Sequence, residues 1–298
     1  MNMSPNELKE GMEKLGYISN DEIVITTYLA LKMEKPLLVE GAPGVGKTEI
    51  AKVLSEIFNT DLIRLQCYEG LDETKSLYEW NYQRQLLKIQ LSQNEQCGLQ
   101  EKDLFSEEFL LERPLLKAIR ADRKVVLLID EVDKVDEPFE AFLFELLSDF
   151  QVSIPELGTL TARQIPIVVL TSNSERLLSD GLKRRCIYLY IDYPTVEKEI
   201  RILQARVPEA GEKLRKQIAY AVNLLRGEYD LNKKPSIAES IDWARALYTL
   251  GIGELSEDAI NNTLNILLKN REDHVSLQNS EKGVRGILEH LHKQVAPQ

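Results

Sequence analysis

The stretch that decides the fold is PLLVEGAPGVGKT, residues 36–48, an apolar run that breaks into a glycine-rich turn and ends in Lys-Thr. Glycines remove the Cβ atoms where the backbone must curl, so successive N–H groups can converge on the phosphate oxygens of a nucleotide. Lys47 supplies a positive charge for the β- and γ-phosphates, and the Thr48 hydroxyl is a hard oxygen ligand suited to Mg²⁺. The stretch therefore predicts a phosphate-binding loop.

A helix is expected directly after the loop, because apolar residues recur at helical spacing between Ile50 and Phe58. The N-terminal dipole of such a helix favours a bound anion. A chance match of the loop pattern in an ordinary turn is the alternative, but strand, loop and helix follow in the order that phosphate binding needs. The residues predicted to bind the nucleotide here are Gly41, Ala42, Pro43, Gly44, Val45, Gly46, Lys47, Thr48 and Glu49.

Length and composition point to a globular protein of two domains. The 298 residues, 43% of them hydrophobic, are enough for one domain of about 190 residues and a smaller one. No apolar run approaches the roughly eighteen residues of a membrane span, and residues 1–16 lack the apolar core of a signal peptide. Cys67, Cys97 and Cys186 are odd in number and far apart, which favours reduced thiols. We therefore expect a cytoplasmic protein without a membrane span.

The net charge of −11 is unevenly distributed along the chain. Residues 194–298 hold 15 basic and 15 acidic residues, so the first 193 residues, with 22 basic and 33 acidic, carry the whole excess. A motor that moves along nucleic acid usually shows a basic stripe, because phosphate contacts dominate its affinity. No such cluster is present in the sequence, which makes a nucleic-acid partner unlikely without excluding a local basic patch.

Four further β-branched or aliphatic runs predict strands. The second is continuously apolar, as expected for a parallel strand covered on both faces, and the third is likewise expected to be buried. The four runs lie at residues 62–66, 125–129, 167–170 and 187–191. A short hairpin is expected over residues 151–162, and residues 78–82 look helical. Beyond Pro194 the strand pattern ends and helical periodicity continues to the C-terminus. The expected domains are residues 1–193, an α/β domain, and residues 194–298, a helical domain.

Asp130 and Glu131 follow the strand predicted at residues 125–129. A carboxylate at the C-terminal end of a buried strand can hold Mg²⁺ or its water shell, which is the role predicted for Asp130 together with Thr48. The adjacent Glu131 points elsewhere and can polarise an attacking water. Asp133 and Asp136 are expected to cap the next helix. The extra strand between loop and acids, and the Glu after the Asp, indicate ATP hydrolysis.

Other candidate site residues lie at strand ends and near the N-terminus. Asn173 ends the fourth strand, where it can orient the water or touch the γ-phosphate; a turn-forming Asn is the alternative. Arg184 and Arg185 precede the fifth strand, and one guanidinium there could reach a phosphate across a subunit interface, although a basic run is usually a solvated surface. Of the two, we favour Arg185. Tyr17 and Ile18 could flank an adenine ring or be ordinary packing residues.

Four motifs together resemble the AAA+ ATPases of the MoxR family: GAPGVGKT at residues 41–48, LLIDEVD at 127–133, LTSN at 170–173 and LSDGLKRRC at 178–186. Three more are similar to the CoxD-like branch of that family. These are RLQCYEGLD at residues 64–72, YEWNYQRQ at 78–85 and FQVSIPELGT at 150–159. The resemblance covers nearly the whole chain.

The resemblance implies a three-layer α/β/α P-loop domain whose parallel five-stranded sheet has the order 5-1-4-3-2, followed by an all-helical lid. It places a hairpin insertion before the fourth strand, which fits residues 151–162. It also implies a homo-oligomer, a hexameric ring with ATP and Mg²⁺ at subunit interfaces, and the Arg185 neighbourhood as the place of the family's arginine finger. A chaperone-like role is implied, often beside a von Willebrand A-domain partner. CoxD-type members are associated with maturing the metal centre of carbon monoxide dehydrogenase-like molybdenum enzymes.

The sequence departs from the family at the start of one lid helix. Many MoxR proteins carry a sensor arginine in a Ser-Pro-Arg stretch, whereas this chain has KPSIAE at residues 234–239. Ser236 and Glu239 have the spacing of a capping box, which is the structural role we expect for them. Our leading hypothesis is thus an ATP-driven remodelling chaperone, and the alternative is a nucleic-acid-processing AAA+ ATPase subunit.

Overall fold

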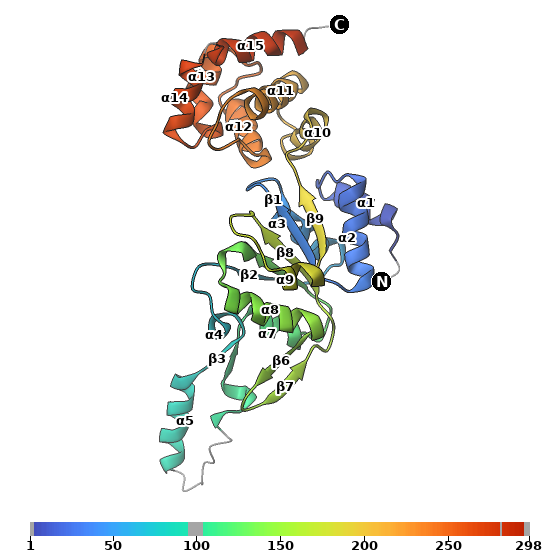
Figure 1. Cartoon of the computed structure of the whole chain (residues 1–298), viewed down its shortest axis with the longest axis vertical. Coiled ribbons are helices and arrows are strands. Elements are labelled where there is room, and N and C mark those ends of the chain that lie inside the picture. Colours follow the sequence, from blue (N-terminus) through green and yellow to red (C-terminus); the bar gives the residue numbers. More distant parts are fainter. Residues whose placement is uncertain (1–2, 95–103, 281, 295–298) are drawn as a thin grey trace. The chain divides into compact units, whose positions relative to one another are not determined.

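A parallel five-stranded sheet forms the centre of the N-terminal part (Figure 1). The computed structural model describes residues 3–94, 104–280 and 282–294. The spatial order of the strands is β2-β5-β8-β1-β9, which is 5-1-4-3-2 from the other edge when only the strands of this sheet are counted. The expected fold class and strand order are therefore confirmed. The strands are β1 (Leu37–Gly41), β2 (Leu62–Gln66), β5 (Val126–Asp130), β8 (Ile167–Ser172) and β9 (Ile187–Ile191).

The inner strands are apolar because both faces of the sheet are covered. Every residue of β1, β5 and β8 is buried, as expected for parallel strands between two helical layers. The register places Leu65 of β2 beside Ile129 of β5, and Ile129 beside Leu170 of β8. The carboxyl ends of these strands consequently meet at one edge of the sheet, where the polar residues of the site lie.

Helices pack on both faces of this sheet (Figure 1). Side chains of α7 (Pro114–Arg120) and α8 (Glu137–Asp149) share one apolar cluster with the residues of β5 that face them, Leu127 and Ile129. On the opposite face, α2 (Asp21–Met33) and α3 (Lys47–Ile57) lie against β1 and β8, where Ala30 and Leu54 line a small cavity with Leu37 and Val169. This gives the predicted α/β/α layers.

Two insertions extend the α/β part. The hairpin β6 (Gln151–Ile154) and β7 (Gly158–Thr161) confirms the prediction for residues 151–162. The helical prediction for residues 78–82 is wrong for Tyr78–Trp80, which is strand β3, paired antiparallel with β4 (Leu110–Glu112). It holds for Tyr82, where α5 begins. Residues 95–103 of the polar segment lie outside the described residues. The remaining short elements here are α4 (Glu73–Ser76), α5 (Tyr82–Asn94), η1 (Glu107–Phe109), η2 (Val132–Lys134) and α9 (Asp180–Arg185).

Within its described residues, the C-terminal part contains helices and connecting loops but no strand, as expected. Its core surrounds Trp243, whose indole Nε1 donates a hydrogen bond to Thr263 Oγ1 at 2.7 Å. A buried ion pair joins Arg226 of α11 to Glu199 of α10, and Ser240 of α12 also donates to Glu199. The helices are α10 (Val196–Arg206), α11 (Glu212–Glu228), α12 (Ile237–Thr249), α13 (Glu257–Leu267), α14 (Arg271–Asn279) and α15 (Gly283–Gln294).

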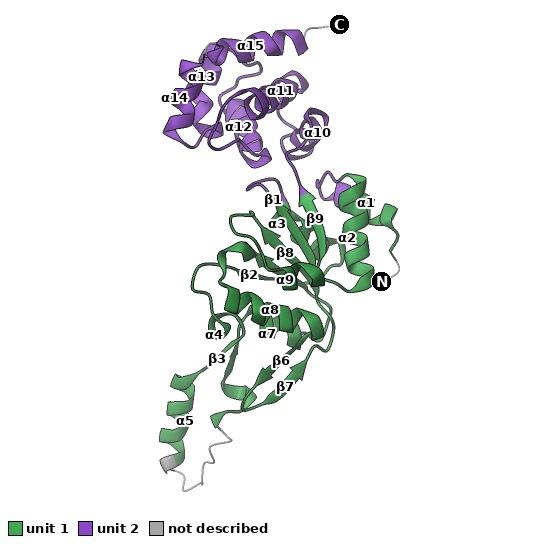
Figure 2. Cartoon of the chain, viewed as in Figure 1, with its two compact units in different colours: residues 1–11, 20–41, 47–190 green, residues 12–19, 42–46, 191–298 purple. Residues whose placement is uncertain are grey.

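The chain divides into two compact units, coloured separately in Figure 2. The first contains residues 1–11, 20–41 and 47–190; the second contains residues 12–19, 42–46 and 191–298. Helix α1 (Pro5–Lys14) therefore runs from one unit into the other. The glycine-rich loop at residues 42–46 belongs to the same unit as the C-terminal helices. The prediction, with a single boundary after residue 193, assigned this loop to the N-terminal domain. The domain limits stay a prediction.

Two simpler expectations concern membrane spans and thiols. Among the described residues, every helix is too short or too polar to cross a membrane. Cys67 and Cys186 are free thiols, and Cys97 lies outside the described residues. Burial, with the carboxylates of Asp130 and Asp133 adding to it, raises the pKa of Cys67 to about 12, so this thiol is uncharged at neutral pH.

Candidate active site

The loop between β1 and α3 adopts a backbone that glycine alone accommodates well. Gly44 and Gly46 have φ angles of +75° and +98°, in the region where side chains with a Cβ are strained. A Cβ on Gly44 would also lie 2.2 Å from Ser236 Oγ, a distance at which one of the two groups must move. The positive φ angles and the nearby Ser236 side chain therefore both require glycine at position 44.

Lys47, the first residue of α3, is buried and lies at the carboxyl edge of the sheet. Its ammonium donates to Gly41 O at 2.7 Å and to Asn173 Oδ1 at 2.8 Å. Burial lowers the pKa of Lys47, and the nearby Asp133, Asp130 and Glu131 oppose that shift by favouring the charged form. The lysine and Asn173, far apart in sequence, are therefore neighbours in the structure.

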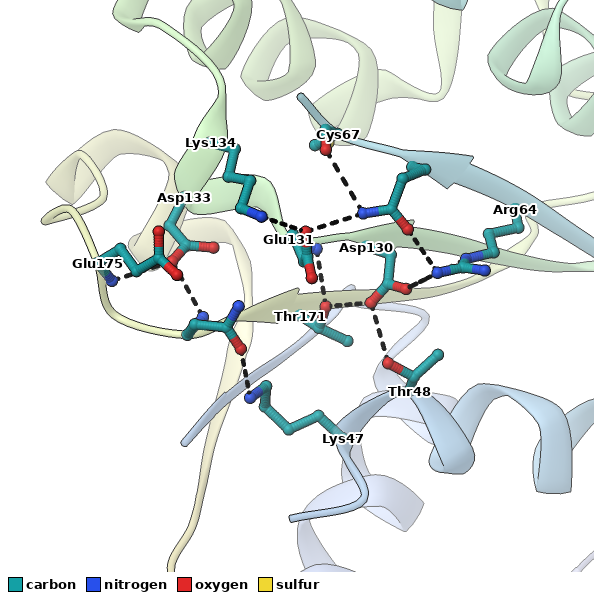
Figure 3. Close-up of polar contacts among 12 residues, drawn as sticks. Lys47, Thr48, Arg64, Cys67, Asp130, Glu131, Asp133, Lys134, Thr171 and Glu175 are labelled. Carbon is teal, nitrogen blue, oxygen red and sulfur yellow. Dashed lines mark hydrogen bonds and ion pairs between the residues drawn. The ribbon is translucent and has the colours of Figure 1, made fainter. Parts of the chain in front are cut away.

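Asp130 ends β5 and is the centre of a hydrogen-bonded cluster (Figure 3). Its Oδ1 accepts hydrogen bonds from Thr48 Oγ1 at 3.0 Å and from Thr171 Oγ1 at 2.5 Å. Its Oδ2 accepts from Arg64 of β2, through Nε at 3.1 Å and Nη2 at 2.5 Å. The predicted pair of Thr48 and Asp130 thus forms, within a larger set that the sequence analysis did not identify.

Glu131 follows Asp130 in a left-handed backbone conformation, with φ of 59°. Positive φ at a residue with a side chain is strained and recurs at functional sites. The Glu131 amide donates to Thr171 Oγ1 at 2.9 Å. Its carboxylate Oε2 accepts from Gln66 Nε2 at 3.0 Å and pairs with Lys134 at 2.8 Å, and this hydrogen bond raises the pKa of Lys134. The two acids therefore point to different partners.

Asp133 has a different role from the helix cap that its position suggested. Asp136 does cap α8, accepting from Phe139 N at 3.0 Å. The Oδ2 of Asp133 instead accepts from the backbone amides of Asn173 and Glu175, both at 3.0 Å, and its Oδ1 is buried without a hydrogen-bond partner among the described residues. The prediction for Asp133 is wrong, because the residue lies in η2 and faces the turn after β8 instead of the start of α8.

The two arginines before β9 differ in their surroundings. The guanidinium of Arg185 lies 3.5 Å from the centroid of the Phe144 ring, and its Nε donates to Ser148 Oγ at 2.5 Å, so it is held against α8. Arg184 is exposed and makes no ion pair or side-chain hydrogen bond within the part of the chain that the structure describes. Of the two, Arg184 is the one free to reach another molecule.

The remaining predicted nucleotide contacts lie near the loop or at the start of α3. Tyr17 is buried, with its ring 3.8 Å from the position that a Cβ on Gly46 would take, and Ile18 is half-buried beside it in sequence. Glu49 lies in the first turn of α3 and pairs with Lys52 at 3.3 Å. Tyr17 thus reaches the loop, whereas Glu49 is engaged by a lysine of its own helix.

A pocket of about 320 Å³ in the second unit includes Pro43 of the loop. Its other lining residues come from the C-terminal part and include Tyr193, Lys233 and Lys234. Ser236 also lines it and caps α12, and with Glu239 it forms the predicted capping box. The capping prediction is confirmed, and the pocket adjoins the residue expected to contact phosphate.

The residues present fit ATP with Mg²⁺. Magnesium takes oxygen ligands and keeps several waters, so one hydroxyl and one carboxylate suffice beside the phosphates. Thr48 can offer an oxygen lone pair to the metal while its hydroxyl donates a hydrogen bond to Asp130 Oδ1. Among the described residues, no group of three or more acidic, histidine or cysteine side chains gathers to hold a metal.

Sequence reasoning missed Arg64, Gln66 and Thr171. These polar residues lie in β2 and β8, on the strands beside β5. The signal available was their position: polar side chains at the carboxyl ends of strands that neighbour Asp130. Using it required the strand order, which the sequence motifs supplied only through the family resemblance.

The sheet order, the loop between β1 and α3, and the acid pair at the end of β5 define a P-loop ATPase of the AAA+ class. Residues 36–186, about half of the chain, match the family model described as AAA domain (dynein-related subfamily). The chain belongs to this family.

Two staphylococcal proteins are similar in sequence to this chain. An uncharacterized protein of Staphylococcus haemolyticus is 26% identical over 190 residues, covering 61% of this chain and 65% of the relative. One from Staphylococcus aureus strain USA300 is 26% identical over 248 residues, covering 78% and 84%. The chain thus matches less than two thirds of the first relative's length.

Among solved structures, the RuvB Holliday junction branch migration motor of Thermotoga maritima aligns with 93% of this chain and 77% of its own, with a TM-score of 0.52 and 18% identity. A point mutant of that protein gives the same TM-score with 16% identity, covering 99% and 84%. At these identities the likeness describes the fold.

Proposed function

We propose that this protein is an ATPase that uses ATP and Mg²⁺. We propose further that it is a remodelling chaperone of the MoxR type, in its CoxD-like branch, and that it uses ATP hydrolysis to mature a protein client. The observation that carries the proposal is the hairpin β6–β7 directly before β8, which is built by the branch-specific residues 150–159. The other branch motifs form the end of β2 and the pair β3–α5. The proposed client is a carbon monoxide dehydrogenase-like molybdenum enzyme, with a von Willebrand A-domain protein as partner.

In the proposed site the loop residues 41–46 hold the phosphates through their backbone amides, and Lys47 and Thr48 follow them without a break in the chain. Lys47 would exchange its hydrogen bond to Gly41 O for a phosphate oxygen. Bound Mg²⁺ would supply positive charge to the β- and γ-phosphate oxygens from Thr48 and Asp130. Tyr17 and Ile18 are proposed to flank the adenine, and Glu49 stays a candidate contact.

Glu131 is proposed to activate the attacking water. Its contacts to Gln66 and Lys134 both use Oε2, so Oε1 is available to accept the proton of a water, within the described structure. Asn173 is proposed to orient that water or the γ-phosphate, because its side chain already meets Lys47 and its backbone is fixed by Asp133. The acids and the amide thus have separate tasks.

We further propose a homo-oligomeric ring, a hexamer in the family pattern, in which an arginine of one subunit completes the site of the next. The structure favours Arg184 over the predicted Arg185 for this task, because the stack on Phe144 and the hydrogen bond to Ser148 occupy Arg185. The free thiols Cys67 and Cys186 support the cytoplasm as the proposed compartment, since it keeps thiols reduced.

The test is capture with the Glu131→Gln protein, which should hold ATP and its client together for longer. A metalloenzyme or a von Willebrand A-domain protein retained only with ATP supports the chaperone role. ATPase turnover is measured in parallel with DNA and with the captured protein. A rate that rises with DNA and not with protein overturns the proposal in favour of a nucleic-acid-processing subunit.

A further inference from the structure

Arg64 makes the one direct contact between a cation and Asp130 in the described residues. It lies on β2 opposite Leu128, two residues before the position paired with Asp130, and its side chain leans along the strand to reach that carboxylate. Two of its nitrogens meet the same oxygen, Oδ2, at 3.1 and 2.5 Å (Figure 3). Its side chain is 54% exposed, whereas that of Asp130 is 5% exposed. The arginine therefore stands between solvent and the buried acid.

The two carboxylate oxygens of Asp130 accept hydrogen bonds from different kinds of donor. Oδ1 receives the hydroxyls of Thr48 and Thr171, which carry no charge. Oδ2 receives only the guanidinium, so Arg64 balances the negative charge without competing for Thr48. Arg64 makes no second ion pair in the described part of the chain, and its other contact is the neutral Gln66. Its charge is thus directed to Asp130.

We propose that Arg64 is a positioning residue that sets the Mg²⁺ requirement of the ATPase, by neutralising Asp130 and fixing its Oδ1 toward Thr48. This inference rests on the proposed magnesium role of Thr48 and Asp130. Asp130 and Arg64 together have a net charge close to zero, so they attract a divalent cation weakly. The Asp130 carboxylate without Arg64 would attract the cation more strongly. The arginine therefore weakens metal binding, so the site loads at higher free Mg²⁺ than an unpaired acid would.

The experiment measures Mn²⁺ binding by electron paramagnetic resonance in the presence of excess ADP, so that no turnover is needed. Arg64→Gln should bind Mn²⁺ about tenfold more tightly than wild type, and the Mg²⁺ concentration for half-maximal ATPase should fall in the same direction. Arg64→Lys keeps the charge and should remain within about twofold of wild type. Arg64→Met replaces Arg64→Gln if that variant does not fold, and it should also bind Mn²⁺ more tightly than wild type.

The matched control is Arg123→Gln, which breaks the exposed pair with Asp61 in the same unit and should leave Mn²⁺ binding unchanged. Equal or weaker Mn²⁺ binding by Arg64→Gln, or the same change in Arg64→Lys, overturns the charge-balancing role. Thr48→Ala tests the proposed metal site independently of Arg64. Weaker Mn²⁺ binding in that variant supports the metal site whatever Arg64 does, whereas unchanged binding refutes the metal assignment itself.

Discussion

The guanidinium of Arg185 stacks 3.5 Å from the ring centroid of Phe144, which fixes it to α8 of its own subunit. An arginine that acts across an interface must be free to leave its own surface. The neighbouring exposed Arg184 meets this condition, and the two residues therefore make a matched pair for testing the proposed finger.

We expect Arg184→Ala to bind ATP normally and to lose turnover by about a thousandfold. The negative charge that develops on the phosphate in the adjacent subunit's site would no longer be balanced by this arginine. Arg185→Ala should lose packing against α8 and only a small part of the activity. Mixing inactive Arg184→Ala with inactive Lys47→Ala subunits should restore some turnover, measured as phosphate release. If only Arg185→Ala loses turnover, Arg185 is the arginine finger, as the sequence analysis predicted.

Glu131→Gln should bind ATP with wild-type affinity and hydrolyse it at least about a hundredfold more slowly. The amide keeps the side chain's size and can still contact Lys134 and Gln66, but it cannot take a proton from water. Single-turnover kinetics measure the chemical step directly. Turnover near that of the wild type would remove Glu131 from its proposed role.

Lys47→Ala should weaken ATP binding by between about ten- and a hundredfold, since a buried charge-assisted contact to phosphate disappears. Calorimetry with ATP measures this affinity. Lys52→Ala is the control, because Lys52 lies one turn later on α3 and pairs with Glu49 at the surface. Equal ATP affinity in the two variants would contradict the loop assignment.

Asp133→Asn should lower kcat by about tenfold while KM for ATP changes little. The charged acceptor for the Asn173 and Glu175 amides becomes neutral, so the turn carrying Asn173 is held less firmly. Asp136→Asn is the matched control, since asparagine caps a helix as well as aspartate. A fall in both kcat values, or in neither, would argue against a positioning role for Asp133.

Arg226→Met should destabilise the C-terminal helices by about 3–5 kcal/mol, because Glu199 would remain buried without its counter-charge. Chemical denaturation, followed by tryptophan fluorescence of Trp243, measures the loss. Arg245→Met removes an exposed arginine of α12 and should cost no more than about 1 kcal/mol. Similar losses in both variants would mean that the buried pair contributes little.

Much of the sheet was predictable because its inner strands are continuous apolar runs. The pattern at residues 125–129 and 167–170 predicted β5 and β8 to within two residues. Strand β3 was not predictable in this way, since three residues rich in aromatic side chains take their conformation from β4, thirty positions later in the chain. Local pattern carries no information about that pairing.

Site residues were predictable where they belong to one sequence motif. They were not predictable where a contact forms only because two strands lie side by side. Lys47, Asp130 and Glu131 are recognisable from their own neighbours in sequence. Arg64 reaches Asp130 only through the parallel register of β2 and β5, and Asp133 reaches Asn173 only because β5 and β8 are adjacent. The sequence presents these as unrelated polar residues.

Gly44 connects the loop to the C-terminal helices as well as to phosphate. The room for a side chain at this position is already taken by the cap of α12, since an added methyl would meet Ser236 Oγ at 2.2 Å. An alanine there would act as a wedge against that helix even before any nucleotide binds. The glycine therefore has two constraints, and a defect at this one residue would disturb the packing of α12 together with the proposed phosphate binding.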